Sequence, residues 1–175
     1  MNTKKNLIIY WTVDWHALKI SYFVKEKLKD NIIDIFNVSE FSENLENYEK
    51  ILIVSSIRYW KFHKNIRDFV EKNFEILNSK KSAFISINLV ARKPNKKTPE
   101  TNVYTRKFFE KTPFKPKLIW VFGWVLDYEK YGFFDWLMIK FIMKITKGPT
   151  NTKDWAIEYT DWNQVEKFCE SFGVL

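Results

Sequence analysis

The hydrophobic residues of this chain fall into two alternating patterns, short continuous runs and longer stretches with helical spacing. Continuous runs are typical of parallel strands covered on both faces, because such strands carry apolar side chains on either side. Five runs meet this description. The predicted strands are Asn6–Thr12, Ile32–Val38, Lys50–Ile57, Ser82–Leu89 and Lys117–Val125.

The stretches between these runs predict helices. After the first run, apolar residues recur every three or four positions with lysines and Glu26 between them, which is the pattern of an amphipathic helix. These apolar residues are Ala17, Ile20, Val24 and Leu28. A second helix is predicted over Lys64–Leu77, with a buried side formed by Ile66, Phe69, Val70, Phe74 and Leu77.

The last predicted helix begins near Asp161. The carboxylate of Asp161 can cap the free N–H groups of the first turn, with Gln164 three residues further on. The buried stripe of this helix comprises Val165, Phe168, Cys169 and Phe172. Cys169 is therefore expected to be a core residue rather than a nucleophile.

Strands that alternate with helices predict one α/β domain over residues 1–175, with a parallel sheet between two helical layers. The exception to the regular spacing is Val90–Pro116, which we interpret as a long insertion (about 90–116) between the fourth and fifth strands. Its first part, ARKPNKKTPE, is too polar and proline-broken for a helix, whereas Thr101–Lys111 can form one.

The composition argues against several kinds of protein. Cys169 is the only cysteine, and His16 and His63 are far apart, so neither a disulfide framework nor a metal-binding cluster is expected. The first apolar stretch is too short for a signal peptide, and no run approaches the roughly 20 apolar residues of a membrane-spanning helix. We expect a cytoplasmic protein that at most contacts the inner face of a membrane.

The positive charge is concentrated in one segment. The chain has 29 lysines and arginines against 21 acidic residues, and nine of the basic residues lie between Ala91 and Lys117 against two acidic ones. Such a segment indicates an anionic partner, namely phospholipid headgroups, nucleic acid or a carboxylate-bearing substrate, although a solvated loop has the same composition. Nucleic acid is not expected, because the segment holds no recognition motif.

Three loops are expected to form the ligand site. In open parallel sheets, ligands bind beyond the carboxyl ends of the strands, where the strand order reverses. The loops there are WTVDWHA, SIRYWKFH and NLVARKP. The second suits a flat conjugated ring, since Tyr59 and Trp60 offer faces for stacking and Arg58 can pair with an anion or cover the ring. Alternatively, these aromatic side chains only cover the edge of the sheet.

Longer motifs point to a family. The stretches SIRYWKFH, SAFISINLVARKPNKKTPETNVYTRKF, DYEKYGFFDWLMIKFIMK and YTDWNQV together resemble the menaquinone-dependent protoporphyrinogen IX dehydrogenases of bacterial haem synthesis. The resemblance runs through nearly the whole chain and is densest from Ser55 to Trp162. It implies a flavodoxin-like three-layer sandwich around a five-stranded parallel sheet of order 2-1-3-4-5, with FMN as the cofactor.

The resemblance also implies a reaction. Protoporphyrinogen IX would pass hydride equivalents to the flavin, and reduced FMN would pass electrons to a membrane quinone, menaquinone or ubiquinone. The basic segment would either hold the protein against anionic lipid or pair with the substrate propionates. Arg58, Tyr59 and His63 are the candidates for catalysis or substrate contact, with no catalytic base identified. The residues expected at the cofactor are Thr12, Val13, Asp14, Trp15, His16, Ser56, Ile57, Arg58, Tyr59, Trp60, Asn88, Leu89, Val90, Ala91, Gly123 and Trp124.

The expected phosphate loop departs from the family pattern. Thr12 and Asp14 match it, but Trp11 stands where a serine is expected, Trp15 where a glycine is expected and Ala17 where a threonine is expected. If the glycine position needs a left-handed backbone, tryptophan there adds strain of about 1–3 kcal/mol. We therefore expect weaker FMN binding, with Trp11 or Trp15 packing on the cofactor. Trp124 likewise stands where the family tends to have glycine.

Two other functions remain open at this point. A flavin-free descendant would keep the fold as a module that binds a membrane or a partner, and a generic FMN-dependent quinone reductase would use another reductant. The stretch Phe133–Ile145 would be apolar nearly all round as a helix. We expect it in the core or at a subunit interface of a homo-oligomer, because thirteen residues cannot span a membrane.

Overall fold

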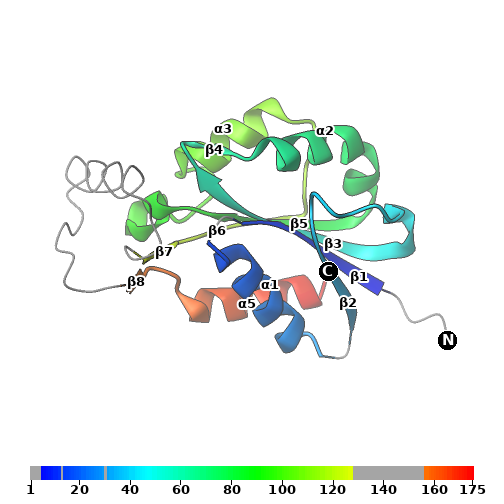
Figure 1. Cartoon of the computed structure of the whole chain (residues 1–175), viewed down its shortest axis with the longest axis horizontal. Helices are drawn as coiled ribbons and strands as arrows, with labels where there is room; N and C mark the ends of the chain where they lie inside the picture. The colour runs from blue at the N-terminus through cyan, green and yellow to red at the C-terminus, as the bar shows by residue number, and fades with distance from the viewer. Residues whose placement is uncertain (1–4, 13, 30, 128–155) are drawn as a thin grey trace.

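A parallel sheet forms the centre of the protein (Figure 1). The computed structural model describes residues 5–12, 14–29, 31–127 and 156–175. The parallel strands are β1 (Lys5–Trp11), β2 (Ile32–Asn37), β3 (Tyr48–Arg58), β5 (Lys81–Ile87) and β6 (Leu118–Phe122). Their order, β2-β1-β3-β5-β6, confirms the predicted order 2-1-3-4-5.

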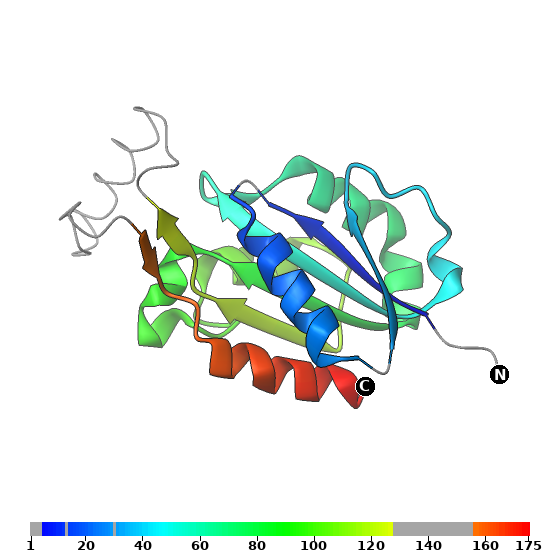
Figure 2. The ribbon, with the colours of Figure 1, turned by 60° about the horizontal axis from the view of Figure 1, so that its bottom comes forward.

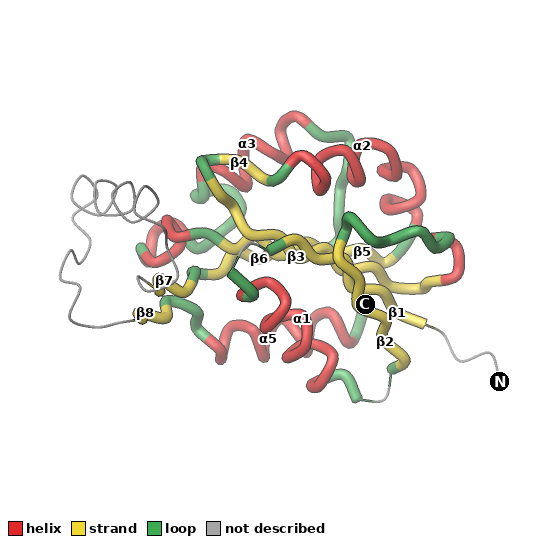
Figure 3. Tube along the Cα trace, viewed as in Figure 1, coloured by secondary structure: helices red, strands yellow, loops and turns green. Residues whose placement is uncertain are grey.

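Helices cover both faces of this sheet (Figures 1 and 3). One face carries α1 (His16–Lys27) and α5 (Trp162–Gly173), and the other carries α2 (Lys64–Ser79) and α3 (Val103–Lys111). This arrangement confirms the three-layer sandwich. Among the described helices, none has the length and apolar character required to cross a membrane.

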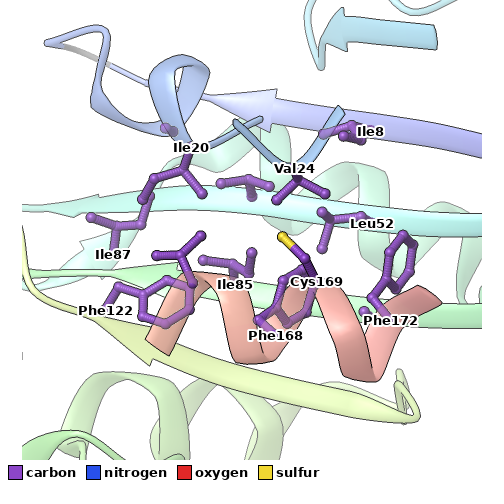
Figure 4. Close-up of a cluster of buried hydrophobic side chains, with 14 of the residues drawn as sticks. Ile8, Ile20, Val24, Leu52, Ile85, Ile87, Phe122, Phe168, Cys169 and Phe172 are labelled. Carbon is purple, nitrogen blue, oxygen red and sulfur yellow. The ribbon is translucent and has the colours of Figure 1, made fainter. Parts of the chain in front are cut away.

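The continuous apolar runs are explained by two separate hydrophobic cores. Along β3, Leu52 and Val54 point to the α1/α5 face, whereas Ile51 and Ile53 point to the α2/α3 face, and all four are fully buried. Successive side chains of a strand point to opposite faces, so a strand buried on both faces must be apolar at every position. Figure 4 shows the core between the sheet and helices α1 and α5.

Helix α5 forms as predicted. The side chain of Asp161 accepts a hydrogen bond from the backbone N–H of Gln164, which satisfies one free donor of the first turn. Its four predicted inward residues are all buried, and Cys169 lies in the core of Figure 4. Burial raises the pKa of the Cys169 thiol to about 11, so this cysteine stays protonated at neutral pH and is no nucleophile.

The segment between β5 and β6 contains the predicted helix. It begins with the short 3-10 helices η2 (Leu89–Arg92) and η3 (Pro94–Lys96) and continues into α3, where Asn102 caps the first turn. Since β5 and β6 are neighbouring parallel strands, the chain must cross back over the sheet between them. The basic segment therefore includes this crossover, whose helix α3 lies on the α2/α3 face. A further 3-10 helix, η1 (Leu45–Asn47), precedes β3.

The predicted fifth strand was too long at its carboxyl end. β6 ends at Phe122 instead of Val125, because the chain approaches its own returning segment at Gly123. A Cβ atom on Gly123 would lie 2.4 Å from the carbonyl oxygen of Tyr159, so only glycine fits there.

After Gly123 the chain forms a separate antiparallel pair. Strand β7 (Val125–Asp127) pairs with β8 (Ala156–Glu158) in this small second sheet. A short strand that was not predicted, β4 (Lys61–Phe62), pairs antiparallel with the end of β3. The predicted helix Phe133–Ile145 lies outside the described residues.

Candidate functional site

The expected ligand loops gather at the carboxyl ends of the parallel strands (Figures 1 and 2). This edge carries the loop before α1, the turn between β3 and β4, the turn after β5 and the crossing of Gly123 with Tyr159. The loops converge there because all five strands run in the same direction.

The loop before α1 has the backbone that glycine favours. Trp15 occupies the N-cap of α1 with φ 61° and ψ −6°, so the position that the family pattern gives to glycine does have a left-handed backbone. Its side chain is 71% exposed, so this indole lies outside the loop interior. The hydroxyl of Thr12 accepts a hydrogen bond from the backbone N–H of Ala17 at 3.3 Å, which closes the loop. Val13 lies outside the described residues, and Asp14 is half-buried.

Replacing Trp15 with glycine is expected to stabilise the flavin-free protein by up to about 1 kcal/mol. Glycine adopts the left-handed conformation without strain, which raises the free energy of unfolding by about 1–2 kcal/mol. The greater entropy of glycine in the unfolded chain lowers it by about 0.5–1 kcal/mol. Chemical denaturation measures the change. Trp15→Ala is the matched control, since it also removes the indole but keeps a Cβ at φ 61°. An equal gain in both variants would assign the effect to the indole instead of the backbone.

His16 connects this loop to the segment that precedes α5. Its ring is only 3% exposed, and its Nε2 lies 2.7 Å from the hydroxyl of Thr160, which in turn donates to the carbonyl of Gly123 at 2.9 Å. Because that hydroxyl already donates, His16 must donate from Nε2. Burial lowers the pKa of His16 to about 4, which keeps the ring neutral. The side chain of this expected cofactor residue is thus engaged in holding two loops together.

The turn between β3 and β4 holds two exposed aromatic rings in strained backbone. Tyr59 has φ 50° and Trp60 has φ 67°, and these two residues separate the paired residues Arg58 and Lys61. Two-residue hairpin turns with positive φ at both positions favour Asn-Gly. Tyr59 and Trp60 are nevertheless 50% and 59% exposed, and the guanidinium of Arg58 lies 5.2 Å from the centre of the Tyr59 ring. Strain retained around exposed rings is typical of a functional site.

His63 is held in a structural position. Its Nδ1 accepts a hydrogen bond from the backbone N–H of Asn65 at 3.3 Å, which caps α2. Its ring stacks on Trp11, with ring centres 4.2 Å apart and planes inclined by 9°. This stack positions Trp11 beneath the hairpin turn, on the α2/α3 side of the sheet. Neither tryptophan of the first loop is therefore buried within the loop itself.

The turn after β5 is supported by a buried polar network that the sequence did not indicate. Asn88 accepts hydrogen bonds from the backbone N–H of Ala91 and from the side chain of Asn102, and it donates to the hydroxyl of Ser86. Thr105 also donates to Ser86, and Asn102 caps α3. The Asn88 side chain is thus used within the protein, so this turn can offer a ligand mainly its backbone and the side chains of Leu89 and Val90.

Two buried hydroxyl groups at this edge have no hydrogen-bond partner in the described part of the chain. They belong to Ser56, near the end of β3, and to Tyr159, beside Gly123. Buried polar groups are almost always paired, so these hydroxyls suit a polar ligand at the edge. Ser56 was predicted at the cofactor. Tyr159 was missed, although it opens the motif YTDWNQV, and burial raises the pKa of its hydroxyl while Arg92 opposes this shift.

The remaining expected contacts are buried. Ile57 belongs to the α2/α3 core, Trp124 packs into the α1/α5 core, and the carbonyl of Gly123 accepts the Thr160 hydrogen bond. The structure therefore brings the loops together as predicted, while several of the side chains serve the protein itself. The residues that fit a flat, polar cofactor are the loop of Thr12, the hydroxyl of Ser56 and the exposed rings of the hairpin turn. Among the described residues, no group of three or more histidine, cysteine or acidic side chains is placed to bind a metal ion.

Comparison with known proteins gives a consistent result. Residues 7–153 match the flavodoxin domain family. The chain is 41% identical over 174 residues to the protoporphyrinogen IX dehydrogenase [quinone] of Escherichia coli (strain K12), covering 98% of this chain and 96% of that protein. It is 40% identical over 178 residues to the protein of the same name from Leishmania major, covering 98% and 75% respectively.

Solved structures show the same architecture at low sequence identity. A Streptococcus pneumonia TIGR4 flavodoxin is 11% identical with a TM-score of 0.56, and 97% of each chain is covered. A flavodoxin from the domain Archaea is 11% identical with a TM-score of 0.52, covering 97% of this chain and 94% of that one. Both support the fold assigned from the sheet order.

Proposed function

Because the chain belongs to the flavodoxin-domain family of protoporphyrinogen IX dehydrogenases, we propose that it oxidises protoporphyrinogen IX to protoporphyrin IX and passes the electrons to a quinone. The observation that carries this proposal is the 41% identity over 98% of the chain. When bound, FMN supplies the two-electron chemistry, accepting hydride equivalents and returning electrons to the quinone. Three such oxidations convert one substrate molecule, since six hydrogen atoms are removed.

The protein's own residues would bind and orient the cofactor. The backbone N–H groups before α1 and the positive end of its dipole suit the phosphate, with Thr12 closing the loop. The unpaired hydroxyl of Ser56 offers a donor on the same side of the sheet. Tyr59 and Trp60 expose ring faces at the hairpin turn, which suits a flat conjugated ring.

Arg58 and Tyr59 remain the candidates for contact with the substrate. Both lie at the hairpin turn, where the reacting ring of the cofactor is expected. His63 is a weaker candidate for proton transfer, because its Nδ1 is used by the helix cap and its ring faces Trp11. Its proposed role is to position Trp11 and the hairpin turn.

The basic segment supports a peripheral position at an anionic membrane, where the quinone is dissolved. Three of its nine basic residues lie on α3, and the other six lie on the segments that precede and follow this helix. At about 1 kcal/mol for each basic residue near an anionic surface, a few of them acting together suffice for reversible attachment.

The experiment is an anaerobic assay of porphyrinogen oxidation by the purified chain with added FMN and quinone. We expect flavin absorbance on titration, porphyrin fluorescence that increases with time and a requirement for the quinone. The departures at Trp11 and Trp15 favour a second candidate, a flavin-free binding module. Absence of flavin fluorescence quenching at high micromolar FMN, together with absence of porphyrin, would support that module and reject the redox function. Turnover only with a nicotinamide donor would support a generic quinone reductase.

A further inference from the structure

A groove lies beside the hairpin turn, on the α2/α3 side of the sheet. It is enclosed by β4, the first half of α2 and the length of α3, which lie together on one side of Figure 1. Its volume is about 400 Å³. This volume is within the range of about 300–1,000 Å³ that is usual for small-molecule sites.

The groove has an aromatic lining. Phe62 is buried, Tyr104 and Phe108 of α3 are half-buried, and Trp60 of the hairpin turn is exposed. Phe62 and Phe108 are in contact, with ring centres 4.8 Å apart. These faces suit a flat, largely apolar ligand.

The rim of the groove is strongly basic. Lys61, Arg67, Lys107 and Lys111 line it, against the single carboxylate of Glu71. None of these four cations forms an ion pair or side-chain hydrogen bond within the described ranges, whereas their neighbours on α2 and α3 are paired. Lys64 pairs with Asp68 on α2, and on α3 Arg106 lies 3.5 Å from Glu110. Four cations around one aromatic groove, with no partner in the described part of the chain, suit a ligand that carries more than one anionic group.

The groove also continues toward the expected cofactor. A second hollow of about 510 Å³ also lies at the hairpin, and its lining includes Trp11, Arg58 and Tyr59. The two hollows share Lys61, Phe62 and Arg67. A ligand seated in the groove can therefore extend past the hairpin turn to the ring side of the site.

We infer that this groove binds the carboxylate-bearing edge of the tetrapyrrole substrate, an inference that rests on the proposed function. Lys107 and Lys111 hold the two carboxylates from α3, Arg67 is placed to bind one of them with its planar fork, and Trp60 and Tyr104 lie against the macrocycle. The opposite edge of the macrocycle then points to the hairpin turn. An anionic lipid headgroup would match the charge but not the aromatic lining.

The test uses the flavin-loaded protein and two stable probes, protoporphyrin IX and its dimethyl ester. The variant Lys107→Gln/Lys111→Gln removes two groove cations. Its matched control, Lys25→Gln/Lys167→Gln, removes two exposed lysines from α1 and α5, on the opposite face of the sheet. We expect the groove variant to bind the dicarboxylate about tenfold more weakly, since each cation loses a charge-assisted contact. Binding of the dimethyl ester and of FMN should not change, and the control should match the wild type.

The outcomes separate this inference from the proposed function. Equal loss of protoporphyrin IX binding in both variants would show a general charge effect and overturn the groove. Unchanged binding in the groove variant, with FMN binding and porphyrinogen oxidation intact, would overturn the groove while leaving the function standing. If the groove variant instead loses binding to phosphatidylglycerol vesicles and keeps protoporphyrin IX binding, the groove is a lipid site and the inference is wrong. Failure of oxidation in the wild type concerns only the proposed function.

Discussion

Replacing Phe84 with alanine is expected to lower the free energy of unfolding by about 3–5 kcal/mol. Phe84 is fully buried in the middle of β5, and its ring lies 5.2–5.5 Å from the rings of Phe62, Phe108 and Phe109. The substitution would leave a cavity where β4 and α3 pack on the sheet, so both transfer energy and packing contacts are lost. Chemical denaturation of the purified variant measures the loss.

Two control variants test whether the loss of stability comes from the buried aromatic ring. Val174→Ala changes a residue that is 88% exposed and should leave the stability almost unchanged. Phe84→Leu keeps most of the buried volume and should cost less than Phe84→Ala. A loss below about 1 kcal/mol for Phe84→Ala would contradict the tight aromatic packing described beneath the groove.

The second large effect is a loss of stability as the pH falls from 7 to 4. Burial lowers the pKa of His16 to about 4 in the folded protein, whereas its ordinary value is 6.5. Between pH 6.5 and pH 4, His16 is therefore protonated in the unfolded chain and neutral in the folded protein. The stabilisation is fully present above pH 6.5 and is lost progressively toward pH 4. A difference of this size corresponds to about 3 kcal/mol.

Comparison of unfolding curves across this pH range isolates the contribution of His16. In His16→Gln, the amide can still donate to the hydroxyl of Thr160, but the residue no longer titrates, so the slope between pH 6.5 and 4 should be shallower. His63→Gln retains His16 and should keep the steeper slope. Identical slopes for His16→Gln and the wild type would refute a buried neutral histidine at this position.

The residues with strained backbone lie in the loops at the carboxyl ends of the strands, where the cofactor is expected. Trp15, Tyr59 and Trp60 all have positive φ, and each is a large aromatic residue with an exposed side chain. Each such conformation costs about 1–3 kcal/mol unless the surrounding structure enforces it. The hairpin pairing of Arg58 with Lys61 enforces two of them. Aromatic rings held in this way are pre-organised for a flat ligand, which is consistent with the proposed flavin and tetrapyrrole sites.

Much of the architecture was predictable because its determinants are local. The run from Lys50 to Ile57 is apolar on both faces, so a doubly covered strand follows from the sequence pattern alone. Asp161 and the stripe that includes Cys169 likewise predict the start and the buried side of α5. At Trp15 the family pattern has glycine, so the sequence raised a left-handed backbone there only as a condition, and the structure shows that conformation.

The site was predicted less completely, because its side chains depend on distant segments. His16 was expected at the cofactor, yet its partner Thr160 is 144 residues away in the sequence. Asn88 was expected there as well, but Asn102 and Ser86 use its side chain. In both cases the residue lies in the predicted loop, but a partner of its side chain comes from a segment that lies further along the chain.

The order of apolar and polar residues by itself determined the layers of this protein, since burial of one or both faces of an element follows from periodicities of two and 3.6 residues. The tertiary structure alone decided that β6 stops at Gly123, where Tyr159 crosses, and that the hairpin turn and α3 enclose a basic groove. These features arise from contacts between segments far apart in the chain. Local propensity carries no information about which distant segment will pack at a given position.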